Sequence, residues 1–434
     1  MKKRFTAILV CTALLCGCSG NKPAAAETTT TTATAPAETK PEKTFYYITS
    51  DGETEDGFLY DVIHDGDNEY ATINGHSSPP ENMVIPAYID GYPVQKIRYS
   101  AFDRELALKS VTIPDTVIKI DQSFSYCENL ETIEIPESVT EIEGYAFEFT
   151  PWLEKKKAEN PFVVVNNILI DASLMTGDIV IPDNITDIHS GAFADSTITS
   201  VTIPEGIEKI HSSTFSWCEN LREIKLPSTL KEIGAGAFSG CISLESIVIP
   251  PSVTWINWNA FRGCEKLADI TFPEKLNYIG GSAFEDTKWL ADRQQENPYV
   301  IIDNILIDGT AVTGEAVIPD GVVEIGEYAF SDNENLTSVI MPDSVTIVEE
   351  RAFDECINLE NVRFSEFIED TGYCIFEGCV KLTHLNIPNG IDIDLFESAY
   401  GHEEPEFAVT AEYQGNIWNY TADGFVSTAS TVER

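Results

Sequence analysis

The stretch Phe238-Ser-Gly-Cys-Ile-Ser-Leu-Glu-Ser-Ile-Val-Ile-Pro-Pro-Ser-Val-Thr-Trp-Ile256 is one unit of a pattern that returns along most of the chain. In outline the unit reads A-F-x-x-C-x-x-L-x-x-I-x-I-P-x-x-V-x-x-I. Its phenylalanines recur at intervals of 22, 23 or 46 residues, and the longest interval is twice 23, so the phase is kept. A fixed period of this length predicts a solenoid, in which each repeat is one coil that buries its apolar side only against neighbouring coils. The in-phase residues are Phe102, Phe124, Phe147, Phe193, Phe215, Phe238, Phe261, Phe284, Phe330, Phe353 and Phe376.

The residue types within one unit predict two short extended segments. Ser246-Ile-Val-Ile249 alternates in polarity and is rich in β-branched residues, which is typical of a strand. Pro250 cannot donate a ladder hydrogen bond and so ends that strand. Val253 and Ile256 mark a second extended segment, and the few residues before the next Ala-Phe pair predict a single helical or 3₁₀ turn.

The repeated motif L-x-x-I-x-I-P followed by A-F-x-x-C resembles the BspA-like leucine-rich repeats of bacterial surface proteins. The resemblance extends from about Val84 to Pro388, with departures at Phe364-Ser365, where Ile-Pro is expected, and at Ile375, which replaces Ala before Phe376. It implies a leucine-rich-repeat stack with a parallel β-sheet on the concave side and short turns, 3₁₀ turns or short strands on the convex side. It also implies a surface adhesion or interaction protein.

The N-terminus carries a targeting signal. Lys2, Lys3 and Arg4 precede an apolar run from Phe5 to Leu15 that is too short to span a membrane stably. The following Leu15-Cys-Gly-Cys18 resembles a bacterial lipobox, which implies cleavage before Cys18 and lipidation of its sulfur. Ordinary secretion with cleavage nearby is the alternative. The expected location is the bacterial cell surface, with membrane contact only through this lipid anchor.

The remaining sequence divides by composition and pattern. A Thr/Ala/Pro-rich stretch without large apolar residues predicts an extended linker behind the anchor. Strand-like runs at Phe58–Ile63 and Tyr70–Ile73, and a candidate strand at Phe407–Tyr413, predict caps over the open ends of the solenoid. The predicted organisation is a signal peptide at 1–17, a linker at 18–44, an N-terminal cap at 45–97, the solenoid at 98–390 and a C-terminal cap at 391–434.

The two double-length intervals contain matching insertions, offset from each other by 137 residues. Thr150–Pro161 and Thr287–Pro298 each predict a short helix with Thr as the N-cap and Asn-Pro as the stop. Val163–Ile170 and Val300–Ile307 each predict a hairpin around an Asn-containing turn. The insertions are either ligand-binding elements or alternative coils covering one side of the stack, and the Trp-Leu pair at each helix start favours packing.

The formal net charge of −44 disfavours nucleic acid and anionic membrane surfaces as partners. Asp65-Gly-Asp-Asn-Glu69 does not complete a calcium loop, because His76 stands where a bidentate Glu is needed. The sequence contains no C-x-x-C pair that would indicate a zinc site. Six of the 10 cysteines fall three residues after an in-phase Phe, so their Cβ atoms point the same way and we expect small buried side chains rather than disulfides.

The search for chemistry yields no catalytic residue, metal site or cofactor. The 6 His form no H-E-x-x-H or H-x-H pair, and no phosphate-binding loop or G-x-S-x-G turn occurs. Acidic pairs are too common in this chain to exclude a glycosidase dyad by sequence. Trp217, Trp255 and Trp258 replace small or polar residues of neighbouring repeats, so they are candidates for stacking on a glycan or for packing between coils.

The candidate binding surface comes from the alternation of the first strand in each unit. The residue between the two inward aliphatic residues points outward, and this row includes Val180 and Val317. A partly apolar strip in an acidic molecule favours a binding surface, and the resemblance places it on the concave side; strand propensity alone is the alternative explanation. The candidate ligand-binding residues are Thr112, Glu134, Thr202, Lys225, Val248, Thr271, Ile340, Arg363 and Asn386.

We therefore expect a monomeric cell-surface lipoprotein whose repeat module binds a macromolecule. The partner is an unidentified extracellular protein or a glycan. Glycan capture by the three Trp residues is one alternative, and a carboxylate-dependent enzyme is another.

Overall fold

The computed structural model describes residues 47–66, 68–387, 410–413, 416–421 and 424–427. The candidate lipidation residue Cys18, the signal peptide at 1–17 and the linker at 18–44 lie outside the described residues. So do much of the region 391–434 and the first three residues of the strand expected at Phe407–Tyr413.

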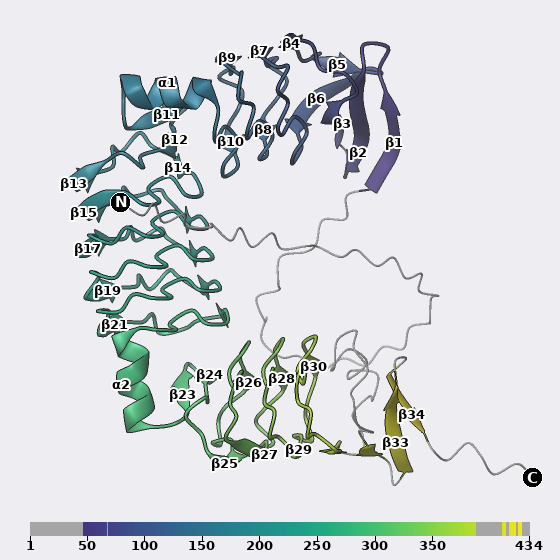
Figure 1. Cartoon of the computed structure of the whole chain (residues 1–434), viewed down its shortest axis with the longest axis vertical. Helices are drawn as coiled ribbons and strands as arrows, with labels where there is room; N and C mark the ends of the chain where they lie inside the picture. Colours follow the sequence, from purple (N-terminus) through teal and green to yellow (C-terminus); the bar gives the residue numbers. More distant parts are fainter. Residues whose placement is uncertain (1–46, 67, 388–409, 414–415, 422–423, 428–434) are drawn as a thin grey trace, which may run out of the picture. The chain divides into compact units, whose positions relative to one another are not determined.

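Each coil contributes one longer strand and one strand of mostly two residues, and these form two ladders of parallel strands. We call the two surfaces the long-strand face and the short-strand face. In Figure 1, β25, β27 and β29 lie on one side of the stack and β26, β28 and β30 on the other. The longer strands are β4 (Asn82–Val84), β7 (Ser110–Thr112), β9 (Thr132–Glu134), β13 (Thr176–Val180), β15 (Thr197–Thr202), β17 (Glu223–Lys225), β19 (Ser246–Val248), β21 (Asp269–Thr271), β25 (Gly314–Val317), β27 (Leu336–Ile340), β29 (Asn361–Arg363) and β31 (His384–Asn386).

The short-strand ladder keeps one register from coil to coil within each of its sheets. Its members are β6 (Tyr92–Ile97), β8 (Lys119–Ile120), β10 (Glu141–Ile142), β14 (Asp187–Ile188), β16 (Lys209–Ile210), β18 (Glu232–Ile233), β20 (Trp255–Ile256), β22 (Tyr278–Ile279), β26 (Glu324–Ile325), β28 (Ile347–Val348) and β30 (Asp370–Thr371). Hydrogen-bonded turns occupy the segment before each Ala-Phe pair, where the sequence predicted a helical or 3₁₀ turn. The two extended segments predicted for each unit are therefore confirmed.

The in-phase phenylalanines form the centre of the core. Phe238 stacks on Phe215 and on Phe261, with ring centroids 5.4 and 5.2 Å apart and nearly parallel planes. Similar contacts join the other neighbours within three separate stacks. The first two stacks end on a tryptophan of an insertion: Trp152 lies 4.9 Å from Phe147, and Trp289 lies 5.2 Å from Phe284.

The two insertions adopt the helix and hairpin predicted for them. The helices are α1 (Pro151–Glu159) and α2 (Lys288–Glu296), and the side chain of the N-cap Thr150 accepts a hydrogen bond from the backbone of Leu153. Asn166 and Asn167 turn the first hairpin with φ of 47° and 65°. The hairpin strands are β11 (Val163–Val165), β12 (Ile168–Asp171), β23 (Val300–Ile302) and β24 (Ile305–Asp308).

Each insertion is itself a coil in which a helix replaces the longer strand. The backbone N–H of Trp152 donates to the carbonyl of Leu130, at 2.9 Å, so α1 follows β9 directly, and Figure 1 shows α1 between β9 and β13. Ala172 and Gly309 take the place of the in-phase phenylalanine, since each donates to the next coil as those residues do. At Gly309 a side chain would not fit, because a Cβ there would lie 2.2 Å from the ring of Phe330. Trp152, Leu153, Trp289 and Leu290 are buried, so the packing role of each Trp-Leu pair is confirmed, and a ligand-binding role of the insertions stays untested.

At each end, a set of mutually antiparallel strands joins the outermost strand of a ladder through one parallel pairing. The strands predicted at Phe58–Ile63 and Tyr70–Ile73 are β2 (Phe58–Asp65) and β3 (Asn68–His76). Strand β2 pairs with both β1 (Tyr47–Glu53) and β3, and β3 also pairs with β6. The short strand β5 (Tyr88–Ile89) also pairs with β6. At the other end, β31 pairs with β32 (Thr410–Tyr413), which continues into β33 (Asn416–Thr421) and β34 (Gly424–Ser427).

The in-phase cysteines are buried and unbridged, as the spacing predicted, but they also act as hydrogen-bond donors. Each thiol donates to the carbonyl of the in-phase phenylalanine of the preceding coil, as Cys241 does to Phe215 at 3.1 Å. Asn333 stands at the same position in its coil and donates to the carbonyl of Gly309 at 3.2 Å. This position therefore satisfies a buried carbonyl in coil after coil.

We predict that these six thiols are unreactive in the folded protein. Burial raises the pKa values of Cys127 and Cys218 to about 11, so little thiolate forms at neutral pH. A thiol-reactive dye should label only the partly exposed Cys374 before denaturation, and all seven cysteines of the described residues after denaturation without reductant. Detection by mass spectrometry of disulfides joining neighbouring in-phase cysteines would contradict this.

Candidate functional site

The row of outward residues predicted for the long-strand face is present. Val248 is 66 % exposed, while the flanking Ile247 and Ile249 are 3 % and 1 % exposed. The ladder register places Thr202 beside Lys225 and Val248 beside Thr271. Neither insertion covers Val180, which is 75 % exposed. The concave placement of the row, which the resemblance implied, is not tested and stays a prediction.

The row is not continuous, because α1 and α2 interrupt the ladder. The interruptions leave three segments, of which the central one lies between the two helices (Figure 1). It combines two exposed valines with two threonines and one lysine. The three segments are Thr112 and Glu134, preceded by the exposed Val84; then Val180, Thr202, Lys225, Val248 and Thr271; then Val317, Ile340, Arg363 and Asn386.

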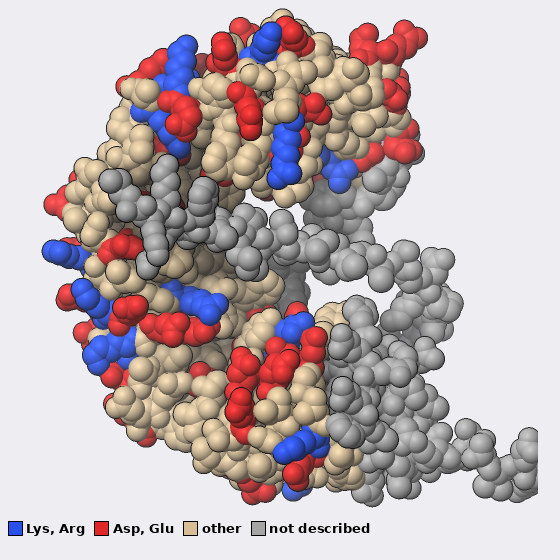
Figure 2. Space-filling model, viewed as in Figure 1, with Lys and Arg blue, Asp and Glu red and all other residues tan. Residues whose placement is uncertain are grey.

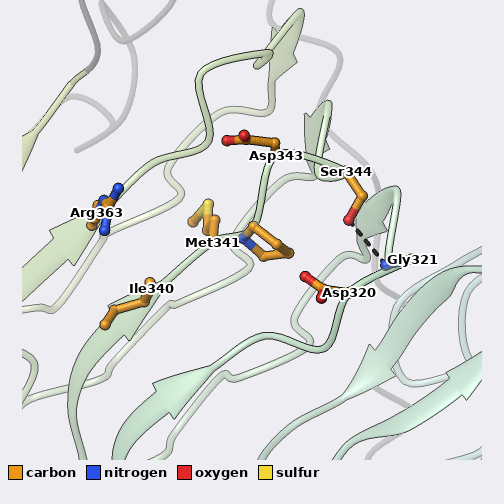
Figure 3. Close-up of a pocket in the computed structure, with 8 residues that line it drawn as sticks. Asp320, Gly321, Ile340, Met341, Asp343, Ser344 and Arg363 are labelled. Atoms are coloured by element: carbon orange, nitrogen blue, oxygen red, sulfur yellow. Dashed lines mark hydrogen bonds between the residues drawn. The ribbon is translucent and has the colours of Figure 1, made fainter.

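The third segment borders a shallow hollow of about 470 Å³. Ile340 and Arg363 come from neighbouring strands, and Asp320 and Asp343 come from the turns that follow the strands (Figure 3). The backbone N–H of Gly321 donates to the Ser344 hydroxyl at 3.1 Å, which joins two of these turns. The hollow therefore has an apolar floor and a rim with carboxylates and one guanidinium.

Charged side chains pair mostly between neighbouring coils. Lys209 contacts Glu232 at 3.0 Å and Lys231 contacts Glu208 at 2.8 Å. Figure 2 shows Lys and Arg interspersed with Asp and Glu over the visible face. Exposed pairs of this kind contribute about 0–1 kcal/mol each, so their main effect is to oppose wrong registers between coils.

The three candidate tryptophans do not form one cluster. Trp255 packs against Tyr278, with ring centroids 5.1 Å apart, and the Tyr278 hydroxyl donates at 2.9 Å to Glu327, whose carboxylate also interacts with Trp258. Trp217 lies elsewhere, in the turn after an in-phase phenylalanine, and is 56 % exposed. Trp255 and Trp258 therefore share an environment that Trp217 does not.

Two bridges across the insertions were not predicted from the sequence. Nε2 of the buried His189 hydrogen-bonds the carbonyl of Glu143 at 2.5 Å, across the first insertion. Glu327 reaches across the second insertion to the backbone N–H of Gly281, at 3.0 Å. Burial raises the pKa of this glutamate. The sequence contained one sign of this bridge: the residue equivalent to Glu327, 137 residues earlier beside the first insertion, is Ser190.

We predict that His189 makes stability depend on pH. Burial lowers its pKa to about 4 from the ordinary 6.5, against the smaller opposing influence of its hydrogen bond to the Glu143 carbonyl and of Asp187. The contribution of His189 to the free energy of unfolding is therefore fully present above pH 6.5. It is lost as the pH falls toward 4, because the unfolded chain binds the proton before the folded chain does. The expected loss is on the order of 3 kcal/mol.

Urea denaturation at about pH 7.5 and about pH 4.5 tests this by comparing three proteins. The wild type and His64→Gln, which removes a partly exposed imidazole, should both show the loss. His189→Gln should lack this contribution. Equal pH dependence in all three proteins would contradict the assignment.

The described residues contain no group of three or more His, Cys, Asp or Glu side chains placed to hold a metal ion. Within the same residues, no helix is long and apolar enough to cross a membrane. The geometry instead repeats one coil, with an exposed strand surface, from Val84 to Asn386.

A family model described as the BspA type leucine rich repeat region, in 6 copies, matches residues 95–219, 186–311 and 301–399. The matches together cover well over half of the 434 residues. The chain belongs to the BspA-type leucine-rich-repeat family. The leucine-rich-repeat stack predicted from the sequence is confirmed.

Several solved structures are similar to this BspA-type chain. A leucine rich cell surface protein from Faecalibacterium prausnitzii has 27 % identity and a TM-score of 0.32, with 81 % of this chain and 86 % of that chain covered. A leucine rich repeat protein of T. pallidum has 26 % identity and a TM-score of 0.30, with 44 % and 91 % covered. Comparison with curated proteins finds no match.

Proposed function

We propose that this BspA-type protein is a surface-anchored module that binds an extracellular protein through the central segment of the long-strand face. The observation that carries the proposal is the exposure of Val180 and Val248 in a molecule of net charge −44. Apolar side chains that are exposed on regular, rigid strands gain free energy when a partner removes them from water. Both β-branched residues also suit a strand without any partner, so a binding experiment is needed.

The charge indicates the kind of protein partner. A strongly acidic molecule attracts basic surfaces and speeds their association. The hollow beside Ile340 offers an apolar floor and the carboxylates of Asp320 and Asp343, which suit a lysine or arginine side chain of the partner. A basic extracellular protein is therefore the partner that we propose. Glycan capture is a second candidate, supported by the exposure of Trp217.

The proposed location is the outer side of a bacterial membrane, with a lipid on Cys18. The support is the charged, apolar and small-residue order of the first 18 residues. Replacing Cys18 with serine should leave uncleaved precursor or release the protein from the membrane fraction, because the serine hydroxyl cannot carry the thioether. Fractionation with radiolabelled palmitate measures both effects. Normal processing and retention of Cys18→Ser would contradict the lipid anchor.

A capture assay tests the binding function itself. The immobilised chain from Ser19 onward, which contains every described residue, is exposed to basic and acidic extracellular matrix proteins and to a polysaccharide panel. Saturable binding of a basic protein that weakens with salt is the expected result. Binding only to polysaccharides, or to no member of either set, would contradict the proposed protein partner.

A further inference from the structure

Trp217 occupies a backbone position that suits glycine. Its φ is 58°, in the left-handed region; the equivalent residues are Gly240 and Gly263 in the next two coils, but Tyr126, Phe149 and Asp195 in earlier coils, all with positive φ. A bulky side chain loses free energy in this conformation, whereas glycine does not. The backbone therefore gives no reason for a tryptophan here, and its 56 % exposure shows that the core gives none either.

The indole rests against a glycine. A Cβ on Gly240 would lie 2.7 Å from Cε3 and 2.9 Å from Cδ2 of Trp217, so the ring packs against that residue's backbone. Gly240 is buried as a result, although it belongs to a surface turn. The Trp217 backbone N–H donates to the carbonyl of Ser239 at 2.7 Å, which fixes the base of the side chain. The ring is thus held in place while more than half of its surface remains open.

The surroundings of the ring are polar. Asp195, at the equivalent position of the preceding coil, and Glu219, two residues after Trp217, are exposed. Among the described residues between Val180 and Val248, Trp217 is the only exposed large apolar side chain. One aromatic ring with carboxylates nearby lacks the apolar cluster that forms the centre of a protein interface.

A sugar ring fits this arrangement better than a protein surface does. It has an apolar C–H face that stacks on an indole and a rim of hydroxyl groups that donate to carboxylates. The net charge of −44 opposes anionic glycans. We propose that Trp217, supported by Gly240, is a binding subsite for one sugar ring of a neutral polysaccharide. This turn is separate from the long-strand face, so either proposal can fail without the other.

Affinity electrophoresis tests the subsite. The chain from Ser19 onward runs through native gels that contain amylopectin, galactomannan or laminarin, with polygalacturonate as the anionic comparison. At least one neutral polysaccharide should retard the wild type, and Trp217→Ala should weaken that retardation about tenfold. No retardation by any of the three neutral polymers, or equal retardation of Trp217→Ala, overturns the proposal. Loss of protein capture with unchanged retardation also overturns it, since the ring would then serve a protein partner.

Two glycine variants supply a matched pair. Gly240→Ala forces the indole away, whereas Gly263→Ala introduces a similar left-handed strain with no atom closer than 3.7 Å to the new Cβ. Gly240→Ala should therefore weaken retardation while Gly263→Ala should not, and equal effects overturn the proposal. If either variant unfolds, ¹⁹F NMR spectra of wild-type protein labelled with 5-fluorotryptophan test the proposal instead. The Trp217 resonance is assigned as the one missing from the spectrum of Trp217→Phe. The retarding polysaccharide should shift this resonance, and an unshifted resonance overturns the proposal.

Discussion

Replacing Phe238 with alanine is expected to lower the free energy of unfolding by about 3–5 kcal/mol, the cost of truncating a fully buried aromatic side chain. Phe238 lies in the middle of the longest stack and contacts an in-phase ring on each side. Its loss therefore weakens two interfaces between coils at once. In a solenoid, stability depends on such nearest-neighbour interfaces, so the damage should spread beyond one repeat.

Urea denaturation followed by circular dichroism measures this effect, and hydrogen exchange locates it. The matched control is Phe367→Ala, because Phe367 is 58 % exposed and lies outside the stacks. The control should change stability by about 0.5 kcal/mol or less. Hydrogen exchange should increase most in the coils on either side of Phe238. A cost below about 1 kcal/mol for Phe238→Ala would contradict the role given to the stack.

The sequence was sufficient for features with a short-range cause. The spacing of the phenylalanines predicted the coils, and alternation predicted that Val248 points outward between two buried isoleucines. Thr150 and the Asn166-Asn167 pair predicted the helix start and the hairpin turn because capping and left-handed turns depend on local residues. These features repeat, so each was visible several times.

Features that depend on contacts between coils were missed. The bridge from His189 to Glu143 joins residues 46 positions apart, and nothing local distinguishes it from any other histidine. The left-handed residues on both sides of every in-phase phenylalanine except Phe124, which has one only after it, were also missed, because residues as different as Tyr145 and Gly191 occupy these positions. The thiol hydrogen bonds required knowing that one coil's cysteine lies over the preceding coil's carbonyl.

The candidate surface was only partly predictable. Its residues followed from alternation, but its division into segments did not, because the sequence does not show that α1 and α2 replace longer strands. The hollow beside Ile340 was also unforeseen, since Asp320 and Asp343 come from turns of neighbouring coils. The separation of Trp217 from Trp255 was missed for a similar reason. The position of a residue within its coil determines on which face of the stack it lies, and residue type alone does not give that position.

The central claim is that the long-strand face binds the partner, and glutamate substitutions test it most directly. Once the capture assay has identified the partner, the double variant Val248→Glu/Thr271→Glu changes the central segment and Ile340→Glu changes the third. The controls are Ile118→Glu and Val323→Glu, which place the same charge on exposed β-branched residues that directly precede short strands.

The measurement is the partner's dissociation constant for each variant, with circular dichroism and melting confirming the fold. The double variant should weaken binding about tenfold or more, because buried carboxylates without a partner are costly at the centre of an interface. Ile340→Glu should weaken it less, and the controls should bind as the wild type does. Folded variants of both segments that bind with unchanged affinity would contradict the account, and the long-strand face would then be scaffold alone.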